Sequence, residues 1–236
     1  MAVAALIPAA GSGSRMGGER PKQFRLLGEL PLLVHTLRIF EHHPAVTAIY
    51  VSLPRAFMDE VALWVYRHDL RKVKKLLPGG RTRQESVWQA LRAVPEEIEW
   101  VLVHDAVRPF VPKGLLDAII EAMRAYGAAI PAVPVVDTLK RVDPNGWVQQ
   151  TLDRAALRAA QTPQAFRRDL LMQAYERARA CGLEATDEAS LVEALGTPVR
   201  VVPGAPENRK LTTPEDWAWA EWWLQQQSNP VSGHRP

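Results

Sequence analysis

The sequence has few of the features that mark secreted, metal-binding or membrane proteins. Its one cysteine, Cys181, excludes an intrachain disulfide and is expected to pack at a helix end rather than act as a nucleophile. The six histidines show no spacing typical of metal ligands. No apolar run approaches the length of a membrane span, and the first residues lack the charged segment of a secretory signal. We therefore expect a cytoplasmic protein with no membrane partner.

Positive charge is present only in mild excess. The formal net charge is +3, and the longest basic stretch is Arg71-Lys72-Val73-Lys74-Lys75, with no aromatic residue between the cations. Such a stretch is more typical of a helix end and a strand entry than of a nucleic-acid surface. We expect no nucleic-acid partner, and the excess suits a small anionic ligand.

Apolar strands alternate with helical periods along the chain. Apolar residues make up 47% of the sequence, enough for one sizeable core, so we expect a single domain over residues 1–236. The alternation predicts an α/β fold, with a Rossmann-like, mainly parallel sheet and helices on both faces. The expected strands are Val3–Ile7, Ala48–Leu53, Val73–Leu77, Trp100–His104, Ala128–Val133 and Val199–Val202, and the expected helices are Leu32–Phe40, Phe57–His68, Gln84–Ala93, Lys113–Tyr126, Arg168–Ala180, Asp187–Leu195 and Pro214–Gln227.

The loop after the first strand has the chemistry of a triphosphate site. Val3–Ile7 is apolar at every position, as a strand buried on both faces must be, and Pro8 ends it. Arg15 and Lys22 supply positive charge where a phosphoryl transition state spreads negative charge. Between Pro8 and these cations, small residues allow backbone N–H groups to approach phosphate oxygens closely: Ala9, Ala10, Gly11, Ser12, Gly13 and Ser14.

Two well-known phosphate loops do not fit this segment. A Walker A loop needs Gly-Lys-Ser or Gly-Lys-Thr at the start of a helix, and Lys22 lies too far from the glycines. A dinucleotide fingerprint needs a third glycine three residues after Gly13, where this chain has Met16. An ordinary strand-to-helix turn is the alternative, and the polar stretch that carries Arg15 and Lys22 argues against it.

Two further loops are expected at the same edge of the sheet. Gly79-Gly80 and Asp105 each follow an expected strand, and the carboxyl ends of parallel strands meet at one edge. A carboxylate that faces a phosphate loop is well placed to hold Mg²⁺, which favours one or two carboxylates plus phosphate oxygens. Asp105 could equally cap the next turn, so both interpretations stand on the residues alone.

Residues 134–163 interrupt the alternation and predict a hairpin, called the arm below. Its centre is Asn145-Gly146, the strongest short hairpin signal. An isolated hairpin cannot bury its own apolar face, so the arm must pack on its own domain or on another copy of the chain. At the C-terminal end, Thr213 and Pro214 suit the start of a helix whose tryptophans we expect to pack mostly as core. Residues 228–236 are expected to form a disordered tail.

A series of motifs runs in order over almost the whole chain. The first are Pro8-Ala9-Ala10-Gly11-Ser12-Gly13-Ser14-Arg15-Met16 and Pro21-Lys22-Gln23. The later ones are Gly79-Gly80 with Arg83 and Ser86, His104-Asp105-Ala106-Val107-Arg108-Pro109, Asp137-Thr138-Leu139-Lys140, Asp153-Arg154, Thr162-Pro163-Gln164, Thr186-Asp187-Glu188-Ala189-Ser190 and Asn208-Arg209-Lys210-Leu211-Thr212. Together they resemble the 2-C-methyl-D-erythritol 4-phosphate cytidylyltransferases of the non-mevalonate isoprenoid pathway.

The resemblance implies an enzyme that joins CTP and 2-C-methyl-D-erythritol 4-phosphate to give 4-diphosphocytidyl-2-C-methyl-D-erythritol and pyrophosphate. It implies Mg²⁺ or another divalent cation on Asp105, and a homodimer in which the arm crosses to the second subunit. The catalytic residues implied are Arg15 and Lys22 on the α-phosphate and Arg154 and Lys210 on the acceptor. The implied nucleotide-binding residues are Pro8, Ala9, Ala10, Gly11, Gly13, Gly80, Arg83, Ser86 and Ala106, and the implied acceptor-binding residues are Asp137, Thr138, Arg154 and Lys210.

Other functions remain open on the sequence. A cytidylyltransferase for a pentitol phosphate, such as ribitol 5-phosphate, would share the nucleotide half of the site. A nucleotide-sensing module without catalysis would keep the loop, and a nicotinamide oxidoreductase is disfavoured by the glycine spacing. The chain departs from the family pattern at Arg209, where an aliphatic residue is usual, and at Glu207, which replaces an aspartate. We leave Glu207 out of the expected metal site.

Overall fold

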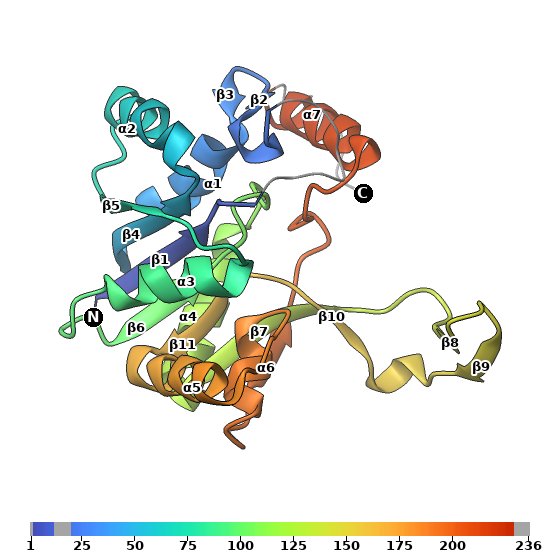
Figure 1. Ribbon diagram of the computed structural model, residues 1–236. Helices are drawn as coiled ribbons and strands as arrows, with labels where there is room; N and C mark the ends of the chain where they lie inside the picture. The colour runs from blue at the N-terminus through green and yellow to red at the C-terminus, as the bar shows by residue number, and fades with distance from the viewer. Residues whose placement is uncertain (1, 12–19, 229–236) are drawn as a thin grey trace.

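The computed structural model describes residues 2–11 and 20–228. An eight-stranded sheet crosses the molecule in the order β10-β7-β11-β6-β1-β4-β5, with β12 beside β7 (Figure 1). Its strands are β1 (Val3–Pro8), β4 (Val46–Leu53), β5 (Val73–Pro78), β6 (Trp100–Val103), β7 (Ala128–Pro134), β10 (Arg158–Ala160), β11 (Gln164–Arg167) and β12 (Arg200–Pro203). The neighbours of β1, and the pairs β4–β5 and β7–β12, are parallel. The expected α/β class and mainly parallel sheet are confirmed.

Helices cover both faces of this sheet, as expected. One face carries α1 (Leu32–Glu41), α2 (Met58–Arg67) and α4 (Lys113–Tyr126), and the other carries α3 (Arg83–Arg92), α5 (Arg168–Cys181) and α6 (Glu188–Glu193). Every expected strand and helix is present, with ends within two residues of the expected ones. Cys181 does end a helix, but its side chain is exposed, so the expectation that it packs was wrong.

Two strands of the main sheet were not predicted. β11 lies between β6 and β7 and pairs antiparallel with both, while β10 pairs antiparallel with a later stretch of β7. Each has only three or four residues, too few to show a strand period in the sequence. Because β10 belongs to the main sheet, the part of the arm that lies beyond this sheet is residues 135–157.

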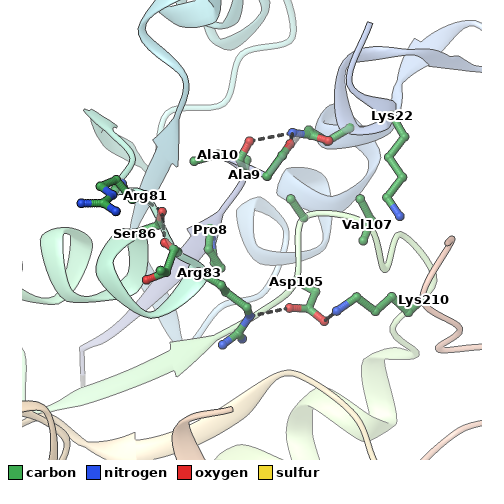
Figure 2. A pocket seen from close by; sticks show the side chains of 15 residues that line it. Pro8, Ala9, Ala10, Lys22, Arg81, Arg83, Ser86, Asp105, Val107 and Lys210 are labelled. Carbon is green, nitrogen blue, oxygen red and sulfur yellow. Dashed lines mark hydrogen bonds and ion pairs between the residues drawn. The ribbon is translucent and has the colours of Figure 1, made fainter. Parts of the chain in front are cut away.

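The carboxyl ends of β1, β5 and β6 meet at one edge of the sheet. Backbone hydrogen bonds to neighbouring strands continue past the end of each strand into the loop that follows it. The Ala9 N–H donates to Ser52 O (2.6 Å), the Gly79 N–H to Leu53 O (2.9 Å) and the His104 N–H to Leu6 O (2.9 Å). Figure 2 shows Pro8, Ser86 and Asp105 gathered at this edge. The convergence expected from parallel strands therefore positions the candidate site.

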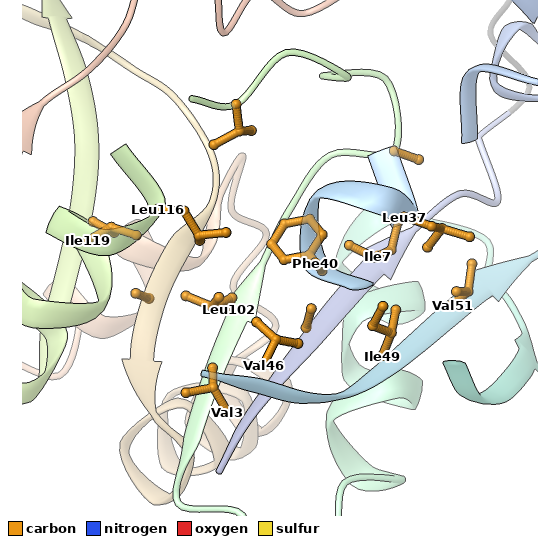
Figure 3. Close-up of a cluster of buried hydrophobic side chains, with 14 of the residues drawn as sticks. Val3, Ile7, Leu37, Phe40, Val46, Ile49, Val51, Leu102, Leu116 and Ile119 are labelled. Atoms are coloured by element: carbon orange, nitrogen blue, oxygen red, sulfur yellow. The ribbon is translucent and has the colours of Figure 1, made fainter. Parts of the chain in front are cut away.

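β1 runs through the centre of the core and is buried on both faces. Val3, Ala5 and Ile7 pack on the side of α1 and α4, where Phe40 and Leu116 lie (Figure 3). The alternate residues, Ala4 and Leu6, pack on the side of α3 and α5. Burial of each large aliphatic side chain stabilises the fold by about 1.5–3 kcal/mol, so the first strand is held firmly beneath the loop that follows it.

The arm contains the predicted hairpin. β8 (Lys140–Val142) and β9 (Val148–Thr151) pair antiparallel, and Gly146 takes a φ of +88° at the turn. Figure 1 shows this hairpin held away from the rest of the chain. Apolar side chains on the arm are exposed, among them Val136 (81%) and Trp147 (75%). The arm therefore leaves apolar surface uncovered within a single chain.

The C-terminal helix α7 (Pro214–Ser228) begins as predicted, with the Asp216 N–H donating to Thr213 Oγ1 (3.2 Å). Trp219 and Trp223 pack on a small cluster around Phe110, close to the short strands β2 (Leu26–Leu27) and β3 (Leu30–Pro31), while Trp222 is half exposed. The expected tail lies outside the described residues, apart from Ser228, which belongs to α7. Among the described helices, none has the length and apolarity that crossing a lipid bilayer requires.

Candidate active site

A pocket of about 290 Å³ opens at the carboxyl edge of β1, β5 and β6. It is lined by Pro8, Ala9, Ala10, Gly11, Lys22, Gln23, Gly80, Arg81, Thr82, Arg83, Ser86, Asp105, Ala106, Val107 and Lys210. The structure thus brings together most residues that the sequence singled out for nucleotide and metal binding. Gly13 and Arg15 lie outside the described residues. In Figure 2, Lys22 and Lys210 enter the pocket on the side opposite Arg83.

Gln23 shapes the loop that follows β1. Its side-chain amide donates to the carbonyl oxygens of Ala9 (2.8 Å) and Gly11 (2.7 Å), and the residue is only 3% exposed. It follows Lys22 in the short helical turn η2 (Lys22–Phe24), so this one turn supplies a cation to the pocket and the amide that holds the loop after β1 in place. Gln23 belongs to one of the motifs named above, but no role could be predicted for it from the sequence, because its partners are backbone atoms.

The loop after β5 fits against the first loop with no spare room. A Cβ on Gly79 would stand 2.1 Å from the Cβ of Ala10, and a Cβ on Gly80 would stand 2.3 Å from the Cβ of Glu85. Ser86 Oγ accepts from the Gly80 N–H (3.1 Å) and donates to Thr82 O (2.9 Å). Gly79 is therefore required for close contact between the two loops, Gly80 is required for close contact with Glu85 on α3, and Ser86 holds the second loop to α3.

Gly79→Ala is expected to weaken nucleotide binding and to lower stability by about 1–3 kcal/mol, since the new methyl overlaps a Cβ fixed to the backbone. The measurement is the melting temperature together with the KM for the nucleotide. Gly114→Ala is the matched control, because no atom of the described residues lies within 4 Å of a Cβ there, and its melting temperature should be unchanged or slightly higher. Equal behaviour of the two variants would contradict the tight fit of the loops.

Asp105 is the electrostatic centre of the pocket. Its carboxylate lies 3.1 Å from Arg83 Nε, 3.4 Å from Arg108 Nε and 2.9 Å from Lys210 Nζ. Burial alone would raise the pKa of Asp105, but the positive charges of Arg83, Lys210 and Arg108 outweigh it and hold that pKa well below its usual range. The carboxylate is therefore ionised at any physiological pH.

His104, the residue before Asp105, is buried and neutral. Its Nε2 lies 3.0 Å from Arg108 O, and its Nδ1 lies 3.0 Å from Thr162 Oγ1, which also accepts the Asp105 N–H (3.1 Å). Burial lowers the pKa of His104 to about 4. A neutral imidazole that donates to a carbonyl holds the turn around Asp105 in shape without adding charge.

Arg83 is shared between two carboxylates. Its Nη1 and Nη2 donate to the two oxygens of Glu188 (2.8 and 3.0 Å), while its Nε donates to Asp105 (3.1 Å). Burial disfavours the charged guanidinium, but the charges of Glu188 and Asp105 more than compensate and raise the pKa of Arg83 above its ordinary value. The sequence did not predict this contact, because the two residues are 105 positions apart.

The loop that carries Lys210 is tied to the turn around Asp105. The Leu211 N–H donates to Val107 O (2.9 Å), Arg108 Nη1 donates to Asn208 O (2.7 Å), and Asn208 Nδ2 donates to Thr162 O (2.8 Å). These bonds fix the loop, so Lys210 is aimed at Asp105. The sequence noted Asn208 and Arg108 in motifs but assigned neither a position in the site.

Arg209, the residue that departs from the family pattern, faces away from Asp105. Its guanidinium lies 4.9 Å from the ring centroid of Trp219 and 3.9 Å from an Asp216 oxygen. The substitution therefore serves the packing of α7. Glu207 is not among the residues that line the pocket.

A second pocket, of about 220 Å³, adjoins the first. It is lined by Arg83, Asp105, Arg108, Ala160, Gln161, Thr162, Gln164, Thr186, Asp187 and Lys210. Arg83, Asp105 and Lys210 line both pockets, so the two spaces meet at the Asp105 carboxylate. This arrangement can hold two anionic ligands, one in each pocket, with the Asp105 carboxylate and its surrounding cations between them.

The arm residues predicted to bind the acceptor are not in either pocket of their own chain. Asp137, Thr138 and Arg154 are all exposed, and the Arg154 guanidinium donates to Val136 O within the arm. The structure of one chain thus leaves these residues away from the site that they are predicted to complete.

The donor set at Asp105 suits a magnesium ion only in company with a phosphate ligand. Within residues 2–11 and 20–228, no group of three or more histidine, cysteine, aspartate or glutamate side chains is arranged to hold a metal. One ionised carboxylate, beside a loop expected to bind phosphate, matches the way Mg²⁺ binds, with one or two carboxylates, substrate phosphates and water. The residues present therefore fit a cation that arrives with a nucleotide.

Comparison with known proteins gives a consistent result. The family model described as 2-C-methyl-D-erythritol 4-phosphate cytidylyltransferase matches residues 3–226. Proteins of that name from Salinibacter ruber and Syntrophus aciditrophicus are 48% and 43% identical to this chain, over 93% and 97% of its length and 91% and 98% of theirs. A crystal structure of the Thermus thermophilus protein of that name superposes with a TM-score of 0.79 at 38% identity, covering 95% of this chain and 100% of that one.

Proposed function

From the premise that this chain belongs to the 2-C-methyl-D-erythritol 4-phosphate cytidylyltransferase family, we propose that its two joined pockets bring CTP and 2-C-methyl-D-erythritol 4-phosphate together. The chain is therefore a nucleotidyltransferase of isoprenoid precursor biosynthesis, and it releases pyrophosphate. The observation that carries the proposal is the meeting of both pockets at Asp105, among the cations Arg83, Arg108 and Lys210. Two polyanions approach one another only where such charge surrounds them.

CTP occupies the first pocket in this proposal. Ala10 and Gly11 offer their backbone N–H groups to the triphosphate, because Pro8 has no N–H and the Ala9 N–H already donates to Ser52 O. Lys22 faces the α-phosphate. Arg15 serves the same phosphate, as the family resemblance implies. The cytosine lies toward Gly80, Ser86 and Ala106, whose fixed polar groups reject a base that leaves them unpaired.

The acceptor occupies the second pocket, with its phosphate near Arg108 and Lys210. An oxygen of this phosphate attacks the α-phosphorus in line. A new P–O bond forms, the bond to the β-phosphate oxygen breaks, and pyrophosphate carries the electron pair away. Since the attacking phosphate is already ionised, the reaction needs no protein base, and positioning by the cations supplies most of the rate.

A divalent cation fits at Asp105 once the triphosphate is bound. Asp105 would hold it, and it would neutralise charge on the phosphate oxygens. In this proposal Lys210 keeps the acceptor phosphate near the α-phosphate, while Arg83 stays anchored by Glu188. A cytoplasmic location and the absence of a nucleic-acid partner stay predictions.

We also propose that the arm completes the acceptor site of a second copy. Its exposed apolar residues, Val136 and Trp147, need a partner surface, and its polar residues Asp137, Thr138 and Arg154 have no place in the pockets of their own chain. A homodimer with exchanged arms answers both needs, because each arm buries its apolar side and delivers a guanidinium to the other subunit's acceptor phosphate.

Mixing two inactive variants tests the exchange of arms. Lys22→Ala and Arg154→Ala should each be nearly inactive, but a refolded mixture should recover about a quarter of the wild-type rate, since half of the dimers are mixed and each mixed dimer has one intact site. The measurement is pyrophosphate release before and after mixing. If Arg154 acted within its own chain, every site would keep one lesion and no activity would return.

Acceptor specificity tests the function itself. Purified protein with CTP and Mg²⁺ is offered 2-C-methyl-D-erythritol 4-phosphate and ribitol 5-phosphate in parallel, with pyrophosphate release and the cytidylylated product as readouts. We expect a much higher kcat/KM with the methylerythritol compound. A preference for ribitol 5-phosphate would assign the pentitol phosphate activity, and tight CTP binding without product from either acceptor would point to a sensing module.

A further inference from the structure

We propose that Glu188 is a positioning residue that keeps Arg83 from closing on Asp105, so that the Asp105 carboxylate stays available to a divalent cation. This inference rests on the proposed function, because it takes Asp105 as the carboxylate that holds the cation. It gives a role to a buried acid that lines neither of the two joined pockets. Glu188 acts through Arg83 and touches no substrate in this account.

The hydrogen bonds of the Arg83 guanidinium are shared unequally between Glu188 and Asp105. Its two terminal nitrogens form a fork on Glu188 (2.8 and 3.0 Å), and only Nε reaches Asp105 (3.1 Å). A two-pronged pair between arginine and a carboxylate is among the strongest ion pairs that proteins form. Glu188 is 1% exposed, so water does not weaken this pair from the side of the acid.

Glu188 is itself held from three directions. The Tyr175 hydroxyl donates to its Oε1 (3.0 Å) from α5. Its backbone N–H, and that of Ala189, donate to Gln164 Oε1 on β11 (3.1 Å each). Asp187 caps the same helix by accepting the Ser190 N–H (3.0 Å). The carboxylate is therefore fixed before any ligand binds, which is what a positioning residue requires.

The consequence for Asp105 follows from competition for one guanidinium. With Glu188 present, Arg83 makes a single hydrogen bond to Asp105, which a cation on the same carboxylate has to displace or share. Without the Glu188 charge, the terminal nitrogens of Arg83 would lose their fork, and Asp105 is the acid that already touches this guanidinium. A forked Arg83–Asp105 pair would hold the carboxylate more tightly and oppose binding of the cation.

The test measures cation affinity directly. Mn²⁺ replaces Mg²⁺ as the probe, and its free concentration is followed by electron paramagnetic resonance in the presence of saturating CTP without acceptor. We expect Glu188→Gln to weaken Mn²⁺ binding about tenfold, the size of effect usual for groups that orient a metal ligand. The Mg²⁺ concentration for half-maximal turnover should rise by a similar factor, with a smaller change in the KM for the acceptor.

A double variant separates positioning from mere support of the fold. If Glu188 acts through Arg83, then Glu188→Gln should have no further effect on Mn²⁺ affinity in an Arg83→Gln background. Ser190→Ala is the matched control on the same helix. It removes a hydroxyl that bonds to Asp187, and it should leave Mn²⁺ affinity at the wild-type value.

Different results would overturn the role of Glu188 and the proposed function. An unchanged Mn²⁺ affinity in Glu188→Gln, or an equal loss with and without Arg83, overturns the inference while the cytidylyltransferase activity of the wild type stands. If the Gln variant does not fold, Tyr175→Phe removes one bond to Glu188, and a loss of Mn²⁺ affinity of about two- to threefold is expected. No loss there would also overturn the inference. Absence of product in the wild type would instead overturn the proposed function.

Discussion

Lys22→Ala is expected to lower kcat by about 10²–10³-fold, the usual loss when one preorganised group that stabilises transition-state charge is removed. Lys22 is 7% exposed and enters the pocket from the side opposite Arg83 (Figure 2). Positive charge held there before the reaction needs no rearrangement as negative charge develops on the α-phosphate. The loss should appear in kcat more than in the KM for CTP, because the backbone of the loop still binds the triphosphate.

The measurements are steady-state kinetics and the melting temperature, made together. Lys113→Ala is the matched control, since Lys113 is an exposed lysine at the start of α4 that pairs with Asp117. The control should retain wild-type kcat, and a surface pair of this kind contributes little stability. A Lys22→Ala enzyme with near-normal turnover would remove Lys22 from the mechanism.

Asp105→Asn is the second change with a large expected effect. The new side chain has the same shape but no charge, so the divalent cation loses its protein ligand, and turnover should fall by at least about 10²-fold. CTP should still bind without metal, because Arg83, Arg108 and Lys210 then present more uncompensated positive charge to the triphosphate. The pattern to look for is therefore retained nucleotide binding with lost catalysis.

The same variant has a stability cost. Three cations lose a shared counter-ion, although Arg83 keeps Glu188 and Arg108 keeps Asn208 O. We expect a loss on the order of 1–3 kcal/mol in the free energy of unfolding without ligand, measured by chemical denaturation. Asp117→Asn, on the surface of α4, is the control for removing a paired aspartate. Full activity of Asp105→Asn at ordinary Mg²⁺ concentrations would exclude Asp105 as the metal ligand.

The architecture could be predicted because its signals are local and periodic. A run such as Val3–Ile7, apolar at each position, predicts a strand buried on both faces, and α4 shows a full helical period that ends at Gly127. The strands β10 and β11 escaped prediction because three or four residues carry no period. Their pairing with β6 and β7 is determined by tertiary contacts between residues far apart in the sequence, which local sequence patterns do not predict.

Parts of the candidate site could likewise be predicted from the sequence, and other parts could not. Pro8, Gly80 and Asp105 could be placed together because each lies at or just beyond the carboxyl end of a strand in a mainly parallel sheet, so topology alone brings them to one edge. The partnership of Arg83 with Glu188 could not be foreseen, since nothing near either residue indicates the other. The clash that makes Gly79 necessary depends on Ala10, a neighbour only in space. Contacts of this kind determine how the predicted residues are held, and only the folded chain shows them.

The most direct test of the central claim is a crystal structure of the protein with CTP and Mg²⁺. The account predicts the triphosphate against residues 8–11, the α-phosphate near Lys22, and the metal ion bound by Asp105 and phosphate oxygens, with Arg83 still forked on Glu188. A triphosphate bound elsewhere, with Asp105 keeping its ion pairs to Lys210 and Arg108 and no metal beside it, would contradict the account.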